Sequence, residues 1–212
     1  MKKILFVLLG VAASAQDEKV ENDARFHPLL LSAAKSHESY GIADDAVRFA
    51  PELCMAPNLP VRLSASKDPA THGQKLYFLY AWDAEAYLKD GRKERLRKSA
   101  AAPVYEQKPA SQVLVKQSWT AVEAKRGQES IDRKVRFLQK DGQVFTTGEK
   151  KDLFIMVKLD EKTDGTDRGW VYGTVTPDLK SVTSSGRVRS CMDCHEKAGD
   201  GRLFGLPKAD KK

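Results

Sequence analysis

The spacing of apolar residues along the chain changes near residue 74 from that of helices to that of strands. Before that point, residues 28–36 and 42–49 carry apolar side chains at the spacing of short helices. After it, short apolar runs separated by turn residues predict about five or six strands. The short connections predict mostly antiparallel pairing. The predicted strands are residues 75–82, 112–119, 134–139, 143–147, 153–159 and 169–176, with a hairpin turn at Asp141-Gly142.

Two of these strands carry more information than the others. Residues 75–82 are apolar at odd and even positions, as in a strand that is buried on both faces. Residues 112–119 alternate with a period of two, so their side chains divide between the two faces of the sheet. One face receives Val113, Val115 and Trp119, and the other receives Leu114, Lys116 and Ser118.

Helix signals flank the strands. Asp83 predicts the start of a helix that Gly91 ends, and residues 98–111 predict a loop. Near the C-terminus, Ser190 and Gly199 predict the two ends of another short helix, with Asp193 completing a capping box. The predicted fold class is therefore α+β: a twisted antiparallel β-sheet with a few helices, the last of them close to the C-terminus.

The first residues predict a signal peptide at residues 1–15. Lys2 and Lys3 precede a short apolar run at residues 4–12, and Ala13-Ser14-Ala15 forms a cleavage site of small residues. The run is too short for a membrane span, and no later segment is apolar enough to form one. We therefore expect an exported, periplasmic protein.

The remaining chain divides by composition. Residues 16–73 predict an N-terminal extension that begins with a charged, mobile leader at residues 16–26, residues 74–207 predict the main domain, and residues 208–212 a basic tail. The net charge is +7, but its lysines and arginines are spread out and not interleaved with aromatic residues. Nucleic acid is therefore not an expected partner.

The most specific motif is Cys191-Met192-Asp193-Cys194-His195, the Cys-x-x-Cys-His spacing of covalent haem attachment. Two thiols three positions apart on a helix can reach the two vinyl groups of one porphyrin, and the adjacent imidazole can bind the iron. A zinc site would need further Cys or His ligands nearby, and a redox dithiol would not require the histidine. The motif thus predicts one covalently attached haem c, with His195 as the proximal iron ligand.

The other candidate ligands are weaker. Cys54 has no partner for a disulfide once the motif cysteines are committed, and its apolar surroundings indicate a small buried residue. Met55, Met156 and His72 could each supply a sixth iron ligand, which would indicate an electron carrier. Met156 alternates with the apolar residues of its strand and is expected to pack, and His72 lies in a polar loop.

Three segments in this order resemble the cytochrome P-460 family, which includes the cytochromes c′-beta. They are residues 113–116, residues 169–172, and the haem motif with Leu203-Phe204 downstream; the similarity extends over roughly residues 74–207. The resemblance implies a twisted antiparallel sheet with a few helices, often in a homodimer. It also implies a five-coordinate haem that is open on its distal side.

In the cytochrome P-460 branch a strand lysine bonds to a porphyrin carbon, and Lys116 is the residue that matches it. The resemblance then implies oxidation of hydroxylamine or nitric oxide, with electrons leaving to a periplasmic redox partner. The c′-beta branch implies nitric oxide binding without turnover, and an electron carrier with six-coordinate haem is a third reading. The distal acid and arginine of the enzymes have no match by motif, and Tyr77 and Phe78 occupy the positions where the resemblance places the arginine.

Overall fold

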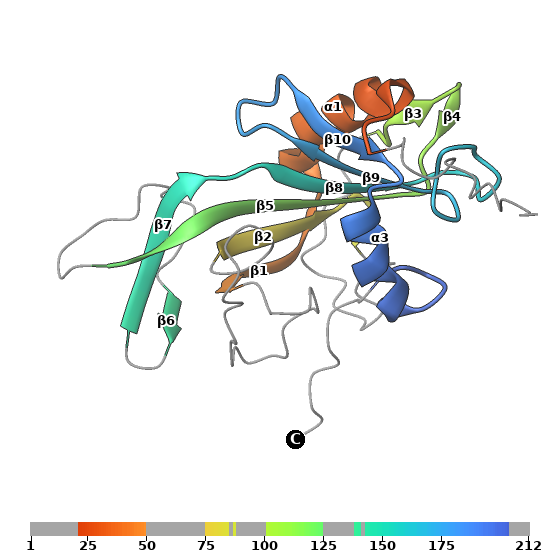
Figure 1. Cartoon of the computed structure of the whole chain (residues 1–212). Coiled ribbons are helices and arrows are strands. Elements are labelled where there is room, and N and C mark those ends of the chain that lie inside the picture. Colours follow the sequence, from red (N-terminus) through yellow and green to blue (C-terminus); the bar gives the residue numbers. More distant parts are fainter. Residues whose placement is uncertain are drawn as a thin grey trace, which may run out of the picture.

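The computed structural model describes residues 21–49, 75–84, 87, 101–124, 138–140 and 143–203. Within these residues the main feature is an antiparallel sheet of eight strands, ordered β1-β2-β5-β8-β9-β10, with β7 paired to β5 and β6 to β7 (Figure 1). The predicted α+β class with an antiparallel sheet is confirmed. The strands are β1 (Gly41–Phe49), β2 (Lys75–Ala81), β5 (Gln112–Glu123), β6 (Leu138–Lys140), β7 (Gln143–Lys150), β8 (Leu153–Lys158), β9 (Trp170–Val175) and β10 (Val182–Gly186).

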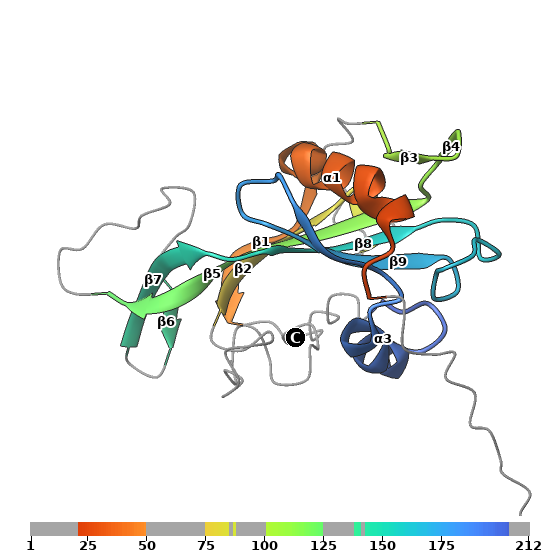
Figure 2. The same cartoon turned by 45° about the horizontal axis from the view of Figure 1, so that its top comes forward.

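The helices lie on opposite faces of this sheet (Figure 2). One face carries α1, which contacts β5, β8, β9 and β10, and the other carries α3. A small ribbon of two strands, β3 and β4, precedes β5. The helices are α1 (His27–Ser36) and α3 (Arg189–His195), with short 3-10 turns at η1 (Ala24–Phe26), η2 (His37–Ser39) and η4 (Glu196–Ala198); the ribbon is Val104–Tyr105 and Lys108–Pro109.

The longest strand, β5, organises the sheet. Its first half pairs with β2 on one side and β8 on the other, and its second half pairs with β7. The predicted alternation is confirmed: Val113, Val115 and Trp119 lie in the core under α1, and Leu114 lies in a second cluster under α3. Because side chains alternate with a period of two, this register also fixes Lys116 on the α3 side.

The contact between α1 and the sheet is close at one point on β9. A Cβ built on Gly173 would overlap the side chain of Leu30, so only glycine lets the helix approach this strand. Leu30 itself has no exposed surface. The N-terminal helix is thereby part of the same core as the central strands.

Residues 42–49 form the edge strand β1, and the prediction of a helix there was wrong. The strand pairs antiparallel with β2, which satisfies its backbone hydrogen bonds. Its register shifts between Ile42 and Asp44 and again between Asp44 and Arg48. These irregularities interrupt the period of two, and the apolar residues therefore have a spacing that resembles a helix.

The prediction of a mobile leader was wrong for residues 21–26. Asn22 forms a parallel bridge with Ser185 of β10, and the backbone N–H of Ser185 donates to Glu21 at 3.0 Å. The charges that suggested mobility are paired: Arg25 donates to Asp23 at 2.6 Å. The backbone N–H of Asp23 also donates to the Ser185 carbonyl at 3.1 Å, so two main-chain hydrogen bonds hold this segment against β10.

Several other boundaries differ from the prediction. The strand β10 was not predicted, because its sequence of Thr, Ser and Gly has little apolar character. The segment predicted as a loop before β5 contains the β3–β4 ribbon. Asp83 does begin a helical turn, since the Tyr87 N–H donates to its carbonyl at 3.1 Å. The rest of that predicted helix, the signal peptide, the basic tail and the Asp141-Gly142 turn lie outside the described residues.

His37 is a buried titratable group in the core under α1. Its Nδ1–H donates to the Ala34 carbonyl at 2.6 Å. Its ring packs edge-to-face with the ring of Tyr80, and the two ring centroids are 4.9 Å apart. Burial lowers the pKa of His37 below its ordinary value, so the native protein holds a neutral imidazole.

The free energy of unfolding is predicted to decrease as the pH falls below about 6.5, because the unfolded chain then binds a proton that buried His37 does not. His37→Phe removes this group and is predicted to flatten the dependence by up to about 1.4 kcal/mol per pH unit. Urea unfolding of both proteins between roughly pH 7 and 5 measures it. Parallel curves for the two proteins would contradict the prediction.

Candidate functional site

The residues of the Cys-x-x-Cys-His motif lie on α3, against the face of the sheet opposite α1 (Figure 2). Cys191 and Met192 pack against a buried cluster that extends from β1 to β9, which we call the α3-side cluster. Its buried members are Ala43, Ala81, Ala84, Tyr87, Leu114, Met156, Trp170, Tyr172 and Val188.

The helix differs at its start from the prediction. It begins at Arg189 after Val188, and neither Ser190 nor another side chain caps it. Its C-terminal boundary is as predicted: η4 continues the helical path and ends at Gly199, whose φ of 87° is in the left-handed region. Both motif cysteines are therefore on consecutive turns of one short helical segment.

The two cysteines are half-buried thiols, and neither forms a disulfide. Burial raises the pKa of the Cys191 thiol to about 11, so it is protonated at neutral pH. Two thiols three positions apart on a helix lie on the same side of it, so both can form bonds to one planar group that lies along the helix. The position of this pair, facing a mostly apolar cluster, fits a porphyrin.

His195 ends α3 and is held in one tautomer. Its Nδ1 lies 2.8 Å from the carbonyl oxygen of Arg202, and a carbonyl can only accept, so Nδ1 carries the proton. Burial lowers the pKa of His195, and the positive charges of Lys116 and Arg202 lower it further, although the hydrogen bond to the carbonyl opposes them. A neutral imidazole with its proton on Nδ1 presents the lone pair of Nε2, which is the form that binds a metal.

Lys116 lies on the same face of the sheet as α3, in the middle of β5. Its neighbours across the strands are Leu79 and Phe154, and its Nζ lies 4.3 Å from the centroid of the Tyr77 ring. His195 lies on the same side, since its ring centroid is 5.6 Å from that of Tyr172, which belongs with Leu114 of β5 to the α3-side cluster. The structure thus brings Lys116 and the haem motif together, from positions about 75 residues apart in the sequence.

Two further polar side chains on this face were not singled out as site residues from the sequence. Lys75 on β2 is 7% exposed, with its Nζ 5.3 Å from the Phe154 ring centroid. Ser118, two residues after Lys116, is fully buried, and its hydroxyl has no hydrogen-bond partner among the described residues. A buried hydroxyl without a partner costs free energy.

The candidate sixth ligands separate in the structure. Met156 is buried in the α3-side cluster, between Leu114 and Tyr172 in the strand register, where it packs. Phe78 points to the α1 side, where its ring meets Trp119 edge-on, whereas Tyr77 points to the α3 side. Cys54, Met55 and His72 lie outside the described residues.

Other kinds of site find no support in the part of the chain that the structure describes. No group of three or more His, Cys, Asp or Glu side chains there could hold a metal ion, so the motif is not part of a zinc site within it. Of the helices in this part, none is long and apolar enough to span a membrane.

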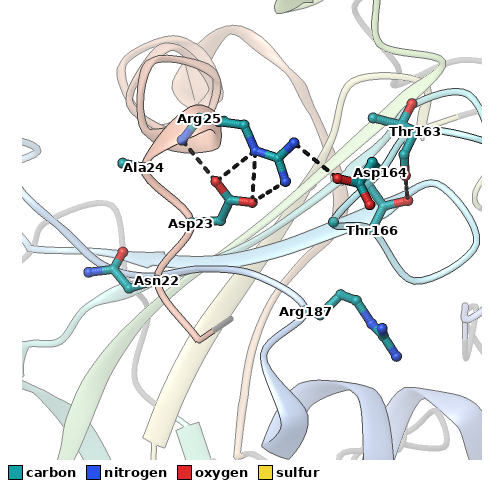
Figure 3. A pocket seen from close by; sticks show the side chains of 9 residues that line it. Asn22, Asp23, Ala24, Arg25, Thr163, Asp164, Thr166 and Arg187 are labelled. Atoms are coloured by element: carbon teal, nitrogen blue, oxygen red, sulfur yellow. Dashed lines mark hydrogen bonds and ion pairs between the residues drawn. The ribbon is translucent and has the colours of Figure 1, made fainter. Parts of the chain in front are cut away.

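A separate polar pocket lies between η1 and the turn at residues 163–166 (Figure 3). Arg25 points between Asp23 and Asp164 and donates to both, so its charge is already paired with two carboxylates. The pocket shares no residue with the α3-side cluster, and we assign no ligand to it.

The fold and the site together define a haem protein with a predominantly antiparallel sheet. A family model described as Cytochrome P460 matches residues 82–202, which is more than half of the chain and includes Lys116 and the whole Cys-x-x-Cys-His motif. The chain belongs to the cytochrome P-460 family, and the resemblance inferred from the motifs is confirmed. Membership implies a c-type haem cytochrome. Comparison with curated proteins gave no match.

Covalent attachment is predicted to require the two cysteines of α3. Cys191→Ala combined with Cys194→Ala is expected to leave no haem on the polypeptide after denaturing electrophoresis, because both thioether bonds are then absent. Haem staining of the separated chains measures this. As the control, Cys54→Ala is expected to retain the haem. Haem that persists on the double variant would contradict the assignment of these thiols.

Proposed function

We propose that the protein is an exported c-type cytochrome that oxidises small nitrogen species, hydroxylamine or nitric oxide, at one haem with an open distal side. In this proposal Cys191 and Cys194 attach the haem and His195 binds its iron. The observation that carries the proposal is the placement of Lys116 and His195 on one face of the sheet, the two residues that the family resemblance assigns to haem chemistry.

The haem supplies the redox chemistry, and the residues of the chain orient it and limit access to it. The Nδ1–H of His195 donates to the Arg202 carbonyl, which would leave Nε2 to bind the iron. Leu114 and Met156 on the sheet and Leu203 after α3 supply apolar surface that excludes water from the porphyrin. An open distal side allows a molecule as small as hydroxylamine to reach the iron.

Lys116 is the proposed site of a covalent bond to the porphyrin. To form this bond, a neutral lysine amine would attack a carbon of a porphyrin that an external oxidant has already oxidised by two electrons, and the displaced protons would pass to solvent. The side chains of Leu79 and Phe154 lie beside Lys116 across the strands and limit the water around it. The adjacent Tyr77 ring holds the side chain over the α3 side of the sheet. These neighbours place the Lys116 side chain on the α3 side, where a bound porphyrin would lie.

The oxidation releases electrons and protons. We propose that the electrons pass to a periplasmic redox partner and the protons to solvent, and that the signal peptide at residues 1–15 directs export. We also propose a homodimer, on the basis of the family resemblance alone. We do not propose nucleic acid as a partner.

A second candidate is a nitric-oxide-binding protein of the cytochrome c′-beta type without turnover. The aromatic surroundings of Lys116 favour it, because the rings of Tyr77 and Phe154 supply apolar cover for a small uncharged ligand. An electron carrier would instead need a sixth ligand, and Met156 is occupied in packing.

Lys116→Leu distinguishes the first two candidates, because it keeps the bulk of the side chain and removes the amine. In the wild type we expect proteolysis to yield a haem that joins the Lys116 peptide to the Cys191–Cys194 peptide. In the variant we expect this link and hydroxylamine oxidation to be lost, with nitric oxide binding retained. Peptide mapping by mass spectrometry and an activity assay measure both.

The matched control is Lys75→Leu, which removes the other lysine of the same face. It is expected to retain the link. Unlinked peptides in the wild type, together with identical absorption spectra for the wild type and Lys116→Leu, would overturn the proposed cross-link and favour the nitric-oxide-binding candidate.

A further inference from the structure

The hydrogen-bond acceptor of His195 lies in a short segment that returns after α3. The carbonyl oxygen of Arg202 accepts from Nδ1 of His195 at 2.8 Å. The backbone of Arg202 has a φ of 59°, in the left-handed region that residues other than glycine rarely adopt. Something outside the segment must hold this conformation.

An ion pair with Asp167 supplies that restraint. The Nε of Arg202 donates to one carboxylate oxygen at 2.8 Å and its Nη2 to the other at 3.0 Å, a two-pronged contact of fixed geometry. The side chains of the pair are only 10% and 11% exposed, so solvent screens their attraction little. The pair joins the turn before β9 to the segment after α3.

Tyr172 and Trp170 of β9 complete the restraint. The Tyr172 hydroxyl donates to Asp167 at 3.0 Å, and the indole N–H of Trp170 donates to the Gly201 carbonyl at 3.1 Å. Burial raises the pKa of Tyr172, and the Asp167 carboxylate raises it further, so the phenol keeps its proton. Burial by itself would raise the pKa of Asp167, but the contacts with Arg202 and Tyr172 prevail, and the carboxyl stays ionised at neutral pH.

We propose that Asp167 and Arg202 are positioning residues for the haem iron: their ion pair fixes the Arg202 carbonyl, which orients the His195 ring and sets its strength as a ligand. The proposal rests on the proposed function in one respect, that His195 binds the iron. The Tyr172 ring, 5.6 Å from the His195 ring between centroids, supports the orientation directly. Such outer contacts control both the tautomer and the basicity of a metal-binding histidine.

The chain also contains a matched control. Arg168 donates to Asp200 at 2.6 Å and so joins the same two segments, but its side chain is 56% exposed and that of Asp200 is 90% exposed. Arg168→Ala therefore removes an arginine–aspartate link between these segments without removing the contact to the Arg202 carbonyl.

The test compares Asp167→Asn, Arg202→Ala and Arg168→Ala in the haem-loaded full-length protein. The readouts are the iron–histidine stretching band of the ferrous haem in resonance Raman spectra and the reduction potential. A weaker hydrogen bond at Nδ1 makes the imidazole a weaker donor, which destabilises the ferric state. We expect a lower band frequency and a more positive potential in both variants of the pair, and neither change in Arg168→Ala.

The signs of the potential shifts separate positioning from a charge effect. Loss of the Asp167 charge alone would raise the potential and loss of the Arg202 charge alone would lower it, whereas lost positioning raises it in both. The expected change in the ratio of ferric to ferrous affinity is roughly threefold to tenfold, or about 30–60 mV for one electron. Opposite shifts, or no shift, would overturn the proposal.

Two milder variants cover the case in which Arg202→Ala fails to fold. Arg202→Lys keeps the charge but loses the two-pronged contact, and Tyr172→Phe removes a single hydroxyl. Both are expected to shift the band in the same direction, and unchanged bands in both would overturn the proposal. Failure of the proposed function differs from these results: the wild-type protein would neither oxidise hydroxylamine nor bind nitric oxide, while potentials of the variants still report on His195.

Discussion

The alternation of side chains along β5 is the constraint on which the site depends. It commits Val113, Val115 and Trp119 to the core under α1 and leaves Leu114 and Lys116 on the α3 side. A slip of one residue in the register with β2 or β8 would exchange the two sets and bury a lysine in an apolar core. The large apolar core under α1 therefore determines which side chains are available to the haem, although it does not touch the motif.

The other wall of the site depends on the same sheet through the turn before β9. Asp167 and Tyr172 hold Arg202, and the Arg202 carbonyl in turn holds His195. Because β8 and β9 pair directly and β8 pairs with β5, the same sheet fixes the positions of Lys116 and of the residues that hold His195. A short helix without a side-chain cap would not position an imidazole by itself. The contacts from the sheet through Arg202 to His195 are therefore what positions the imidazole at the end of α3.

The parts of the fold and of the candidate site that depend on residues close together in the sequence could be predicted from it. The spacing of Cys191, Cys194 and His195 and the alternation around Lys116 depend on neighbours within a few residues, and α1 was predicted for the same reason. The strand β1 was missed because its register shifts blur the period of two. The pair of Asp167 and Arg202 gave no signal at all, since an acid and an arginine 35 residues apart become informative only when the fold brings them together.

The central claim is that the chain supplies one protein ligand to the iron and leaves its opposite side open. The most direct test is the coordination number of the reduced wild-type protein, read from the spin- and coordination-marker bands of its resonance Raman spectrum. The account predicts a high-spin, five-coordinate ferrous haem with His195 as its only protein ligand. A low-spin, six-coordinate ferrous haem would contradict it and would indicate an electron carrier with a second protein ligand.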